Sequence, residues 1–275
     1  MADPYPLAST NVPVAPRLPG EVVVRSDADA LLDAVLAELM VRALSCVRTL
    51  GDFHLALSGG STPMPMYRRL MYDPSYREFP WRKTHLWIVD ERLVGFDDDR
   101  SNYKHIEELI VRHSDIPAQQ VHPMLATEPD ADTRYERELR EALEWRERGQ
   151  DRLDYVLLGM GGDAHTASLF PHSPALIEPE AGRLVLINQG PRVTPPDRVT
   201  LTMEMINASR CVSVLVTGAS KRETVARVSG AYTKERSGPD AASVAEMPIL
   251  GVRPRAGELR WYLDSEACPR VGGEA

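Results

Sequence analysis

The amino-acid sequence predicts an α/β fold: a single domain on a mostly parallel, open sheet with helices on both faces, of the Rossmann-like kind. Short apolar runs alternate with helical segments, and a glycine or acidic turn follows each main run. Such alternation is typical of a parallel sheet covered on both faces. With 275 residues, 43% of them hydrophobic, the chain can bury one large core. The expected strands are 54–57, 85–89, 155–158 and 212–216, with shorter ones at 184–187 and 259–263.

The N-terminal segment 1–20 contains five prolines and few large apolar side chains. A segment of this composition favours an extended chain over a packed one. We therefore expect a flexible arm at 1–20 and a single domain over 21–275. Ser26 is the expected N-cap of a first helix that runs to about Leu50. Its apolar positions are Leu32, Leu36, Leu39, Ala43 and Val47. The charge-rich segment 133–148 is expected to form an exposed amphipathic helix.

Composition excludes several classes of partner. The net charge of −8 argues against general binding to nucleic acid or to an anionic membrane, because both need a basic field. The three cysteines are far apart, which disfavours disulfides and a zinc knuckle and favours a reducing compartment. The N-terminus lacks a signal-peptide pattern, and no uncharged apolar run has membrane-spanning length. The sequence therefore favours a cytoplasmic protein.

The first functional motif follows the strand at 54–57. The residues Ser58, Gly59, Gly60, Ser61 and Thr62 lead into Pro63, which favours the first turn of a helix. The free N–H groups and the positive dipole end of such a helix suit a phosphate group. The lysine of a nucleotide-binding P-loop is absent. The alternative interpretation is a tight strand–helix turn capped by serine.

Basic residues that could face an anion follow later strands. Lys221 is expected in the first turn of the helix after strand 212–216, where a cation opposes the helix dipole. An anionic ligand would explain that position, although an isolated lysine is more often a solvated surface residue. Arg192 and Arg198 are further candidates to face a phosphate.

The third motif ends the strand at 85–89. Asp90 and Arg92 stand at that strand end and are candidates for a functional pair, with an ordinary surface ion pair as the alternative. The acidic triplet 97–99 follows and leads to Asn102. Consecutive carboxylates in a loop are more often a solvated turn than a magnesium site.

The fourth motif follows strand 155–158 and permits two interpretations. Gly159, Gly161 and Ala164 fit the dinucleotide pattern G-x-G-x-x-A. That pattern opens a long helix, whereas Pro171 and Pro174 should end a helix here after about two turns. A bound dinucleotide is therefore not expected.

The second interpretation is catalytic. His165 follows Asp163 at the expected helix start. A histidine can take a proton from water, and a neighbouring carboxylate can hold its tautomer and stabilise the imidazolium. A buried or surface histidine with no catalytic role is the alternative. The other histidines have no metal-binding spacing, so no metal is expected.

The chain resembles the 6-phosphogluconolactonases over about 22–264, because five motifs occur in that family's order and approximate spacing. The motifs are SGGSTP, VDERLV, GMGGDAHTASLFP, PPDRVTLT and TGASK. The resemblance implies hydrolysis of 6-phospho-D-glucono-1,5-lactone to 6-phosphogluconate in the oxidative pentose phosphate pathway. It implies no cofactor and a phosphorylated sugar lactone as the small-molecule partner. Separately, we expect a monomer or small homo-oligomer. Two positions depart from the family's usual glycine, namely Ala164 and His172.

The resemblance also implies a role for individual residues. His165 would be the general base, oriented by Asp163, and Arg92 would stabilise the oxyanion. Asp90 and Asn102 would contact sugar hydroxyls. The residues implied to hold the 6-phosphate are Ser58, Gly59, Gly60, Thr62, Lys221 and Arg192.

Two alternatives to a lactonase remain. Glucosamine-6-phosphate deaminases resemble the chain, but their turn carries a glutamate where this chain has Phe170. A deaminase or an aldose–ketose isomerase is therefore the first alternative. A non-catalytic phosphosugar-binding module is the other alternative. As a sugar-responsive repressor it would need an N-terminal DNA-binding module, which the short proline-rich arm cannot form.

Overall fold

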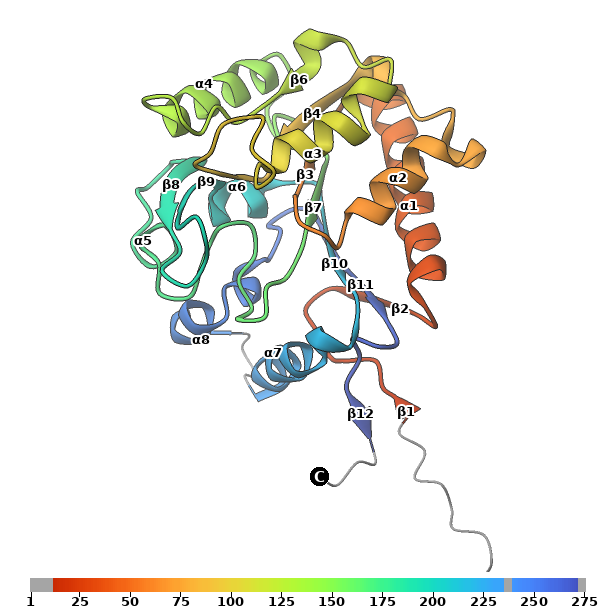
Figure 1. The fold of residues 1–275 in the computed structure, drawn as a ribbon, viewed down its shortest axis with the longest axis vertical. Helices are drawn as coiled ribbons and strands as arrows, with labels where there is room; N and C mark the ends of the chain where they lie inside the picture. Colours follow the sequence, from red (N-terminus) through yellow and green to blue (C-terminus); the bar gives the residue numbers. More distant parts are fainter. Residues whose placement is uncertain (1–11, 235–238, 272–275) are drawn as a thin grey trace, which may run out of the picture.

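The computed structural model describes residues 12–234 and 239–271, and its centre is a sheet of seven parallel strands (Figure 1). The strand order is β2-β11-β10-β7-β3-β4-β6. The strands are β2 (Glu21–Arg25), β3 (Phe53–Leu57), β4 (Thr84–Ile88), β6 (Val121–His122), β7 (Tyr155–Leu158), β10 (Cys211–Val216) and β11 (Glu258–Asp264). The predicted α/β fold with a mostly parallel sheet is confirmed. The strand order reverses between β3 and β7, and ligands of such sheets bind beyond the strand ends at this point.

Helices cover the sheet from both sides. In Figure 1, α1 and α2 lie to the right of the sheet, and α5 and α6 lie to its left. The helices are α1 (Ala28–Leu50), α2 (Met64–Tyr72), α3 (Asn102–Leu109), α4 (Ala131–Glu144), α5 (Pro174–Ile177), α6 (Met203–Ala208), α7 (Arg222–Lys234) and α8 (Ala241–Glu246). The middle strands β3, β7 and β10 consist entirely of buried residues, as expected for strands packed on both faces.

A second, antiparallel sheet adjoins the first. It contains β5 (Asp90–Arg92), β9 (Asp197–Leu201) and β8 (Val185–Gln189) in the order β5-β9-β8. The strand expected at 184–187 belongs to this sheet. Because β5 follows β4 after one residue, the chain passes directly from the main sheet into the small one. The junction places Asp90 and Arg92 beyond the carboxyl end of β4.

The first helix forms much as expected but has a different cap. Its buried face includes Leu32, Leu36, Leu39 and Ala43, whereas Val47 is only partly buried. The N-cap is Asp27, whose carboxylate accepts a hydrogen bond from the Ala30 N–H at 2.8 Å. The Ser26 hydroxyl donates to Asp27 instead, so the prediction of Ser26 as the N-cap is wrong. Carboxylate and hydroxyl are both good caps, and the sequence alone did not decide between these neighbours.

The helix expected over 133–148 is shorter and less exposed than predicted. It ends at Glu144, and its buried face includes Tyr135, Leu139 and Leu143. Beyond its end, the Arg146 side chain is only 2% exposed and pairs with two carboxylates. The high charge of the segment therefore does not mark a solvated surface throughout.

Part of the proline-rich segment is packed, unlike the arm expected over 1–20. Strand β1 (Val12–Pro13) pairs with β12 (Arg270–Val271), and Leu18 is buried. The Trp261 indole N–H donates to the Pro19 carbonyl at 2.8 Å. Residues 1–11 lie outside the described residues.

Candidate active site

A pocket of about 360 Å³ lies where the strand order reverses, and it collects most of the predicted site residues. It is lined by the loop after β3, the segment after β4, the turn after β7, and Lys221 after β10. Four strand ends that are far apart in sequence thus meet at one edge of the sheet. The predicted residues in its wall are Ser58, Gly59, Gly60, Thr62, Asp90, Arg92, Asn102, His165 and Lys221.

The turn after β7 holds the Asp163–His165 pair. The His165 Nδ1–H donates to Asp163 Oδ1 at 2.5 Å, and both side chains are about one quarter exposed. No hydrogen-bond partner of His165 Nε2 is found among the described residues, so this nitrogen is available at the pocket wall. Partial burial alone would raise the pKa of Asp163, but the hydrogen bond and charge of His165 lower it to about 2. The carboxylate is thus ionised at neutral pH and fixes the imidazole tautomer.

The expected helix after His165 is absent, and the chain forms consecutive tight turns before α5. The His165 carbonyl accepts from the Gly161 N–H at 2.9 Å, and the Thr166 hydroxyl donates to the Gly159 carbonyl at 2.9 Å. A side chain at Gly161 would overlap the His165 ring, so this glycine permits the imidazole to lie against the backbone. The glycines of this motif therefore serve close packing around a histidine.

Three non-glycine residues near the histidine have a left-handed backbone. The φ angles are +65° at Ala164, +50° at Ala167 and +57° at His172. Two of them, Ala164 and His172, are the positions where the resembling family usually has glycine. A non-glycine residue in this region is strained by about 1 kcal/mol or more, which surrounding contacts must offset. Ala164 is fully buried and bonds through its carbonyl to the Ile249 N–H.

The glycine loop after β3 presents backbone donors to the pocket. Gly60 has a φ of +90°, and within the described chain no acceptor is found for the N–H groups of Gly60 and Ser61. The Ser58 hydroxyl is already used, because it donates to the Leu157 carbonyl at 2.8 Å. No side chain caps α2, which argues against the alternative of a serine-capped turn. Free N–H groups at a helix start form a site for an anion.

The segment around β5 is held by a buried glutamate that the sequence analysis missed. The Glu91 carboxylate accepts from the backbone N–H groups of Arg92, Asn102 and Tyr103, each at 2.8 Å, and from the Ser101 hydroxyl. The Asn102 amide donates to the Asp90 carbonyl at 2.7 Å. Glu91 therefore caps α3 and fixes the positions of Asp90, Arg92 and Asn102 in the pocket wall.

Asp90 is connected to the turn after β7. Its Oδ2 accepts from the Ser168 hydroxyl at 2.7 Å, and both side chains are buried. Ser168 follows His165 by three residues, so this bond joins the turn after β7 to the end of β4. The alternative of an ordinary surface ion pair between Asp90 and Arg92 does not fit, because none is found and Asp90 is only 8% exposed.

Lys221 lies in a 3-10 turn, Ala219–Lys221, that precedes α7 rather than in the first turn of that helix. Its ammonium donates to the Met160 carbonyl at 2.7 Å and is half-buried. Burial lowers the pKa of Lys221, and the negative charge of nearby Asp163 partly offsets this lowering. The side chain is thus directed into the site and is not a solvated surface lysine.

Arg192 lies apart from the other predicted phosphate ligands. It lines a neighbouring cleft of about 1030 Å³ together with Asp163, Phe170 and Arg227. That cleft shares Gly162 with the pocket. The structure therefore does not bring Arg192 together with the glycine loop, because Arg192 lines the neighbouring cleft and not the pocket.

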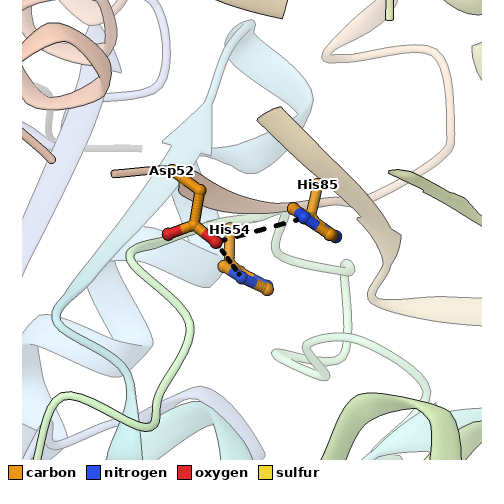
Figure 2. Close-up of side chains that lie close together, drawn as sticks. All are labelled: Asp52, His54 and His85. Carbon is orange, nitrogen blue, oxygen red and sulfur yellow. Dashed lines mark hydrogen bonds and ion pairs between the residues drawn. The ribbon is translucent and has the colours of Figure 1, made fainter. Parts of the chain in front are cut away.

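Asp52, His54 and His85 form a second cluster of ionisable side chains (Figure 2). Asp52 directly precedes β3, so the cluster lies at the amino ends of the strands, whereas the pocket lies at their carboxyl ends. The spacing of the three side chains alone would suit a metal ion, but two observations do not fit one. The His54 and His85 rings are stacked at 4.5 Å with an interplanar angle of 7°, so their in-plane lone pairs cannot converge. The Trp87 indole N–H donates to His54 Nδ1 at 3.0 Å, which leaves the His54 proton on Nε2, facing Asp52.

Fold and pocket together describe an α/β protein with a pocket at the strand ends whose wall contains two cations and a histidine. None of the described helices is long and apolar enough to cross a membrane. The family model of glucosamine-6-phosphate isomerases/6-phosphogluconolactonase matches residues 26–261. The chain belongs to this family.

Individual relatives agree with that assignment. A 6-phosphogluconolactonase of Synechocystis is 36% identical over 83% of this chain and 92% of its own length. A human GDH/6PGL endoplasmic bifunctional protein is 37% identical over 89% of this chain, which spans only 30% of that longer protein. The crystal structure of a 6-phosphogluconolactonase from Thermotoga maritima is 28% identical, with a TM-score of 0.72 over 89% of this chain and 99% of that one.

Proposed function

We propose that this chain hydrolyses 6-phospho-D-glucono-1,5-lactone to 6-phospho-D-gluconate, a step of the oxidative pentose phosphate pathway. The observation that carries the proposal is the His165–Asp163 pair. His165 lies in the wall of a pocket that also contains two cations, and its Nε2 has no partner in the described part of the chain. Relatives named 6-phosphogluconolactonase support the same substrate. Water attack on a lactone carbonyl needs a base and an oxyanion donor, so the reaction requires no cofactor.

The first step would be proton transfer from water to His165. Water attacks C1 of the lactone while Nε2 takes its proton, and the carbonyl electron pair moves to the oxygen to give a tetrahedral oxyanion. Asp163 stabilises the imidazolium that forms and keeps its ring in place. Arg92, in the pocket wall, would stabilise the oxyanion.

The second step would be collapse of the tetrahedral intermediate. The oxyanion re-forms the carbonyl, the bond from C1 to the ring oxygen breaks, and the His165 imidazolium returns its proton to that leaving oxygen. The ring opens to an acid with a new hydroxyl group, and the histidine is again neutral. One histidine thus acts as base and then as acid.

The rest of the pocket would hold the sugar. The N–H groups of the loop Ser58–Thr62 and the Lys221 ammonium would bind the 6-phosphate, while Asp90 and Asn102 would contact sugar hydroxyls. Arg192 would contact the substrate only from the neighbouring cleft, which it lines. We place the reaction in the cytoplasm and propose that the protein acts as a monomer or small homo-oligomer.

The experiment follows release of 6-phosphogluconate from freshly generated lactone, with spontaneous ring opening measured in parallel. Acceleration that scales with protein concentration is the expected result, and equal rates with and without protein would refute the function. Glucosamine 6-phosphate is assayed for ammonia release to test the isomerase alternative of the same family. Ammonia release without lactonase activity would replace the proposal by that alternative.

The role of Lys221 has its own test. Lys221→Ala should raise KM roughly tenfold or more with little change in kcat, because a charge-assisted contact to the phosphate is lost. Lys83→Ala, which removes an exposed lysine just before β4, is the matched control and should change neither constant. An unchanged KM for Lys221→Ala would move the phosphate elsewhere in the pocket.

A further inference from the structure

The His165 imidazole has a second neighbour besides Asp163, and this neighbour is an aromatic ring. The Phe170 and His165 ring centroids are 4.9 Å apart at an angle of 56°. Phe170 is only 4% exposed, although it lines the neighbouring cleft. The hydrogen bond to Asp163 fixes one ring nitrogen of His165, whereas the Phe170 ring restricts the plane in which the imidazole can lie.

The Phe170 ring is itself held from two sides. The Arg198 guanidinium lies over it at 6.0 Å from the ring centroid. The backbone of Gly190 approaches it so closely that a Cβ atom there would be 2.6 Å from the Phe170 ring. A ring between a cation and a close backbone has few alternative rotamers, so its contact with His165 is well defined.

Arg198 is unusual among the buried cations of the described chain. It is 4% exposed, yet no carboxylate within 12–234 or 239–271 lies at ion-pair distance from it, and its Nη1 donates to the carbonyls of Pro195 and Asp197. Burial lowers the pKa of Arg198, and nearby Asp90 partly opposes that effect. By contrast, the buried Arg146 pairs with both Asp52 and Asp154. An unpaired buried charge is costly, and structural stability does not explain why it stands behind the catalytic turn.

We propose that Phe170, supported by Arg198, is a positioning residue for the catalytic histidine. It holds the imidazole plane so that Nε2 points into the pocket while Nδ1 stays on Asp163. The inference rests on the proposed lactonase function, because His165 must be the proton acceptor for its orientation to matter. Misplacement of a reacting group by about 1 Å can cost roughly a hundredfold in rate, so loss of the ring should affect kcat rather than substrate binding.

The test compares two phenylalanines of equal burial. Phe170 and Phe79 are both 4% exposed, but Phe79 packs against Phe53 and Trp81 away from the pocket. Phe170→Leu and Phe79→Leu should lower the thermal unfolding temperature to a similar degree. Only Phe170→Leu should lower kcat, by about 10- to 100-fold with KM within about twofold of the wild type. The His165 ring signal in NMR should also move in Phe170→Leu alone, because the ring current of Phe170 is lost.

Other outcomes would overturn the inference. A kcat of Phe170→Leu within about twofold of the wild type, a loss carried by KM, or an equal loss of kcat in Phe79→Leu would each refute positioning. If Phe170→Leu does not fold, Arg198→Met and Arg198→Lys replace it: Lys keeps a cation over the ring and should retain more kcat than Met. Equal kcat in these two variants would overturn the inference. An inactive wild type would instead refute the lactonase function itself.

Discussion

The sequence pattern Asp-x-His occurs at both ends of the strands of the central sheet, and the two pairs differ in what their second ring nitrogen does. In Asp52–His54 the His54 Nε2 bonds to Asp52 at 3.1 Å, and Nδ1 accepts from Trp87, so both nitrogens are satisfied in a fully buried ring. In Asp163–His165 the bond is 2.5 Å, and Nε2 has no partner among the described residues. The same motif is thus fully hydrogen-bonded in one pair and leaves a nitrogen without a partner in the other. That nitrogen lies beside a pocket, which is why we assign the proposed catalytic role to His165 and not to His54.

The two regions also treat charge differently. Behind Asp52, the Arg146 guanidinium bonds to Asp52 at 2.5 Å and to Asp154 at 2.8 Å, with almost no exposure. Burial alone would raise the pKa of Asp52, but His54 and Arg146 lower it. At the pocket, by contrast, no carboxylate of the described residues lies within ion-pair distance of Arg92 or Lys221, and the Gly60 and Ser61 N–H groups have no acceptor there. Under the proposed function these groups would bind the substrate, whereas the network of Asp52, Arg146 and Asp154 contributes to the core.

The largest effect on stability is expected from removing Arg146, the buried cation that pairs with Asp52 and Asp154. Arg146→Ala removes this cation, and of the ion pairs of Asp154 within the described chain it leaves only the one with Arg210, at 3.2 Å. The free energy of unfolding should fall by about 3 to 5 kcal/mol. Urea denaturation measures the change. The exposed Arg148, two residues further on, offers the control Arg148→Ala, which should stay within about 0.5 kcal/mol. A loss below about 1 kcal/mol for Arg146→Ala would show that the network is not structural.

Substitutions of two adjacent glycines test whether activity depends on the position of the His165 ring. Gly161→Ala should lower kcat by roughly a hundredfold, because the new Cβ overlaps the His165 ring and displaces it. Gly162→Ala is the control, since no atom lies within 4 Å of a Cβ at that position. Steady-state kinetics of both variants distinguishes the two positions, and equal kcat values would mean that His165 does not need its observed place.

The stability of the protein should also depend on pH through His85, which lies in the cluster with Asp52 and His54. Burial, and then the neighbouring His54 and His122, lower the pKa of His85 from 6.5 to about 4. Between these values the unfolded chain binds a proton that the folded protein does not, so the free energy of unfolding should fall as the pH drops from 6.5 to 4. The expected change is about 2 to 3 kcal/mol. Urea denaturation of the wild type and of His85→Gln over this range measures it, and identical pH profiles would exclude His85 as the source.

The smallest effect is expected at Ala164. Ala164→Gly relieves about 1 kcal/mol of left-handed strain but loses a buried methyl group worth about 0.8 kcal/mol. The glycine also gains freedom in the unfolded chain, so the free energy of unfolding should change by less than about 1 kcal/mol. Thermal unfolding checks this. A larger gain in stability would mean that the turn stores more strain than its contacts offset.

Most of the fold and the main site residues were predictable because they depend on local patterns. Apolar runs define the strands, and the glycine loop after β3, Asp163, His165 and Lys221 all follow strand ends that a parallel sheet brings to one edge. The roles of these residues remain predictions, to be tested by the variants above. Of the sequence motifs, the one in the turn after β7, which contains Asp163 and His165, indicated the family most specifically.

Residues whose partners are distant in sequence could not be predicted in this way. Ser168 bonds to Asp90 across 78 positions, and Arg146 bonds to Asp52 across 94. Glu91 looked like one charge in a run of charged residues, although its buried carboxylate organises the pocket wall. The helix expected after His165 does not form, because the His165 carbonyl accepts from the Gly161 N–H within the turn and is not available for a helical hydrogen bond. Only tertiary structure decides which of two equal Asp-x-His motifs has a free nitrogen.

The most direct measurement substitutes both histidines in the same way. His165→Asn and His54→Asn are compared for lactone hydrolysis per folded molecule, with the folded fraction taken from circular dichroism. We predict that His165→Asn loses about 10²- to 10⁴-fold in kcat at near-normal stability, while His54→Asn is destabilised but keeps its kcat. A normal kcat in folded His165→Asn, or an equal loss of kcat in His54→Asn, would contradict the account.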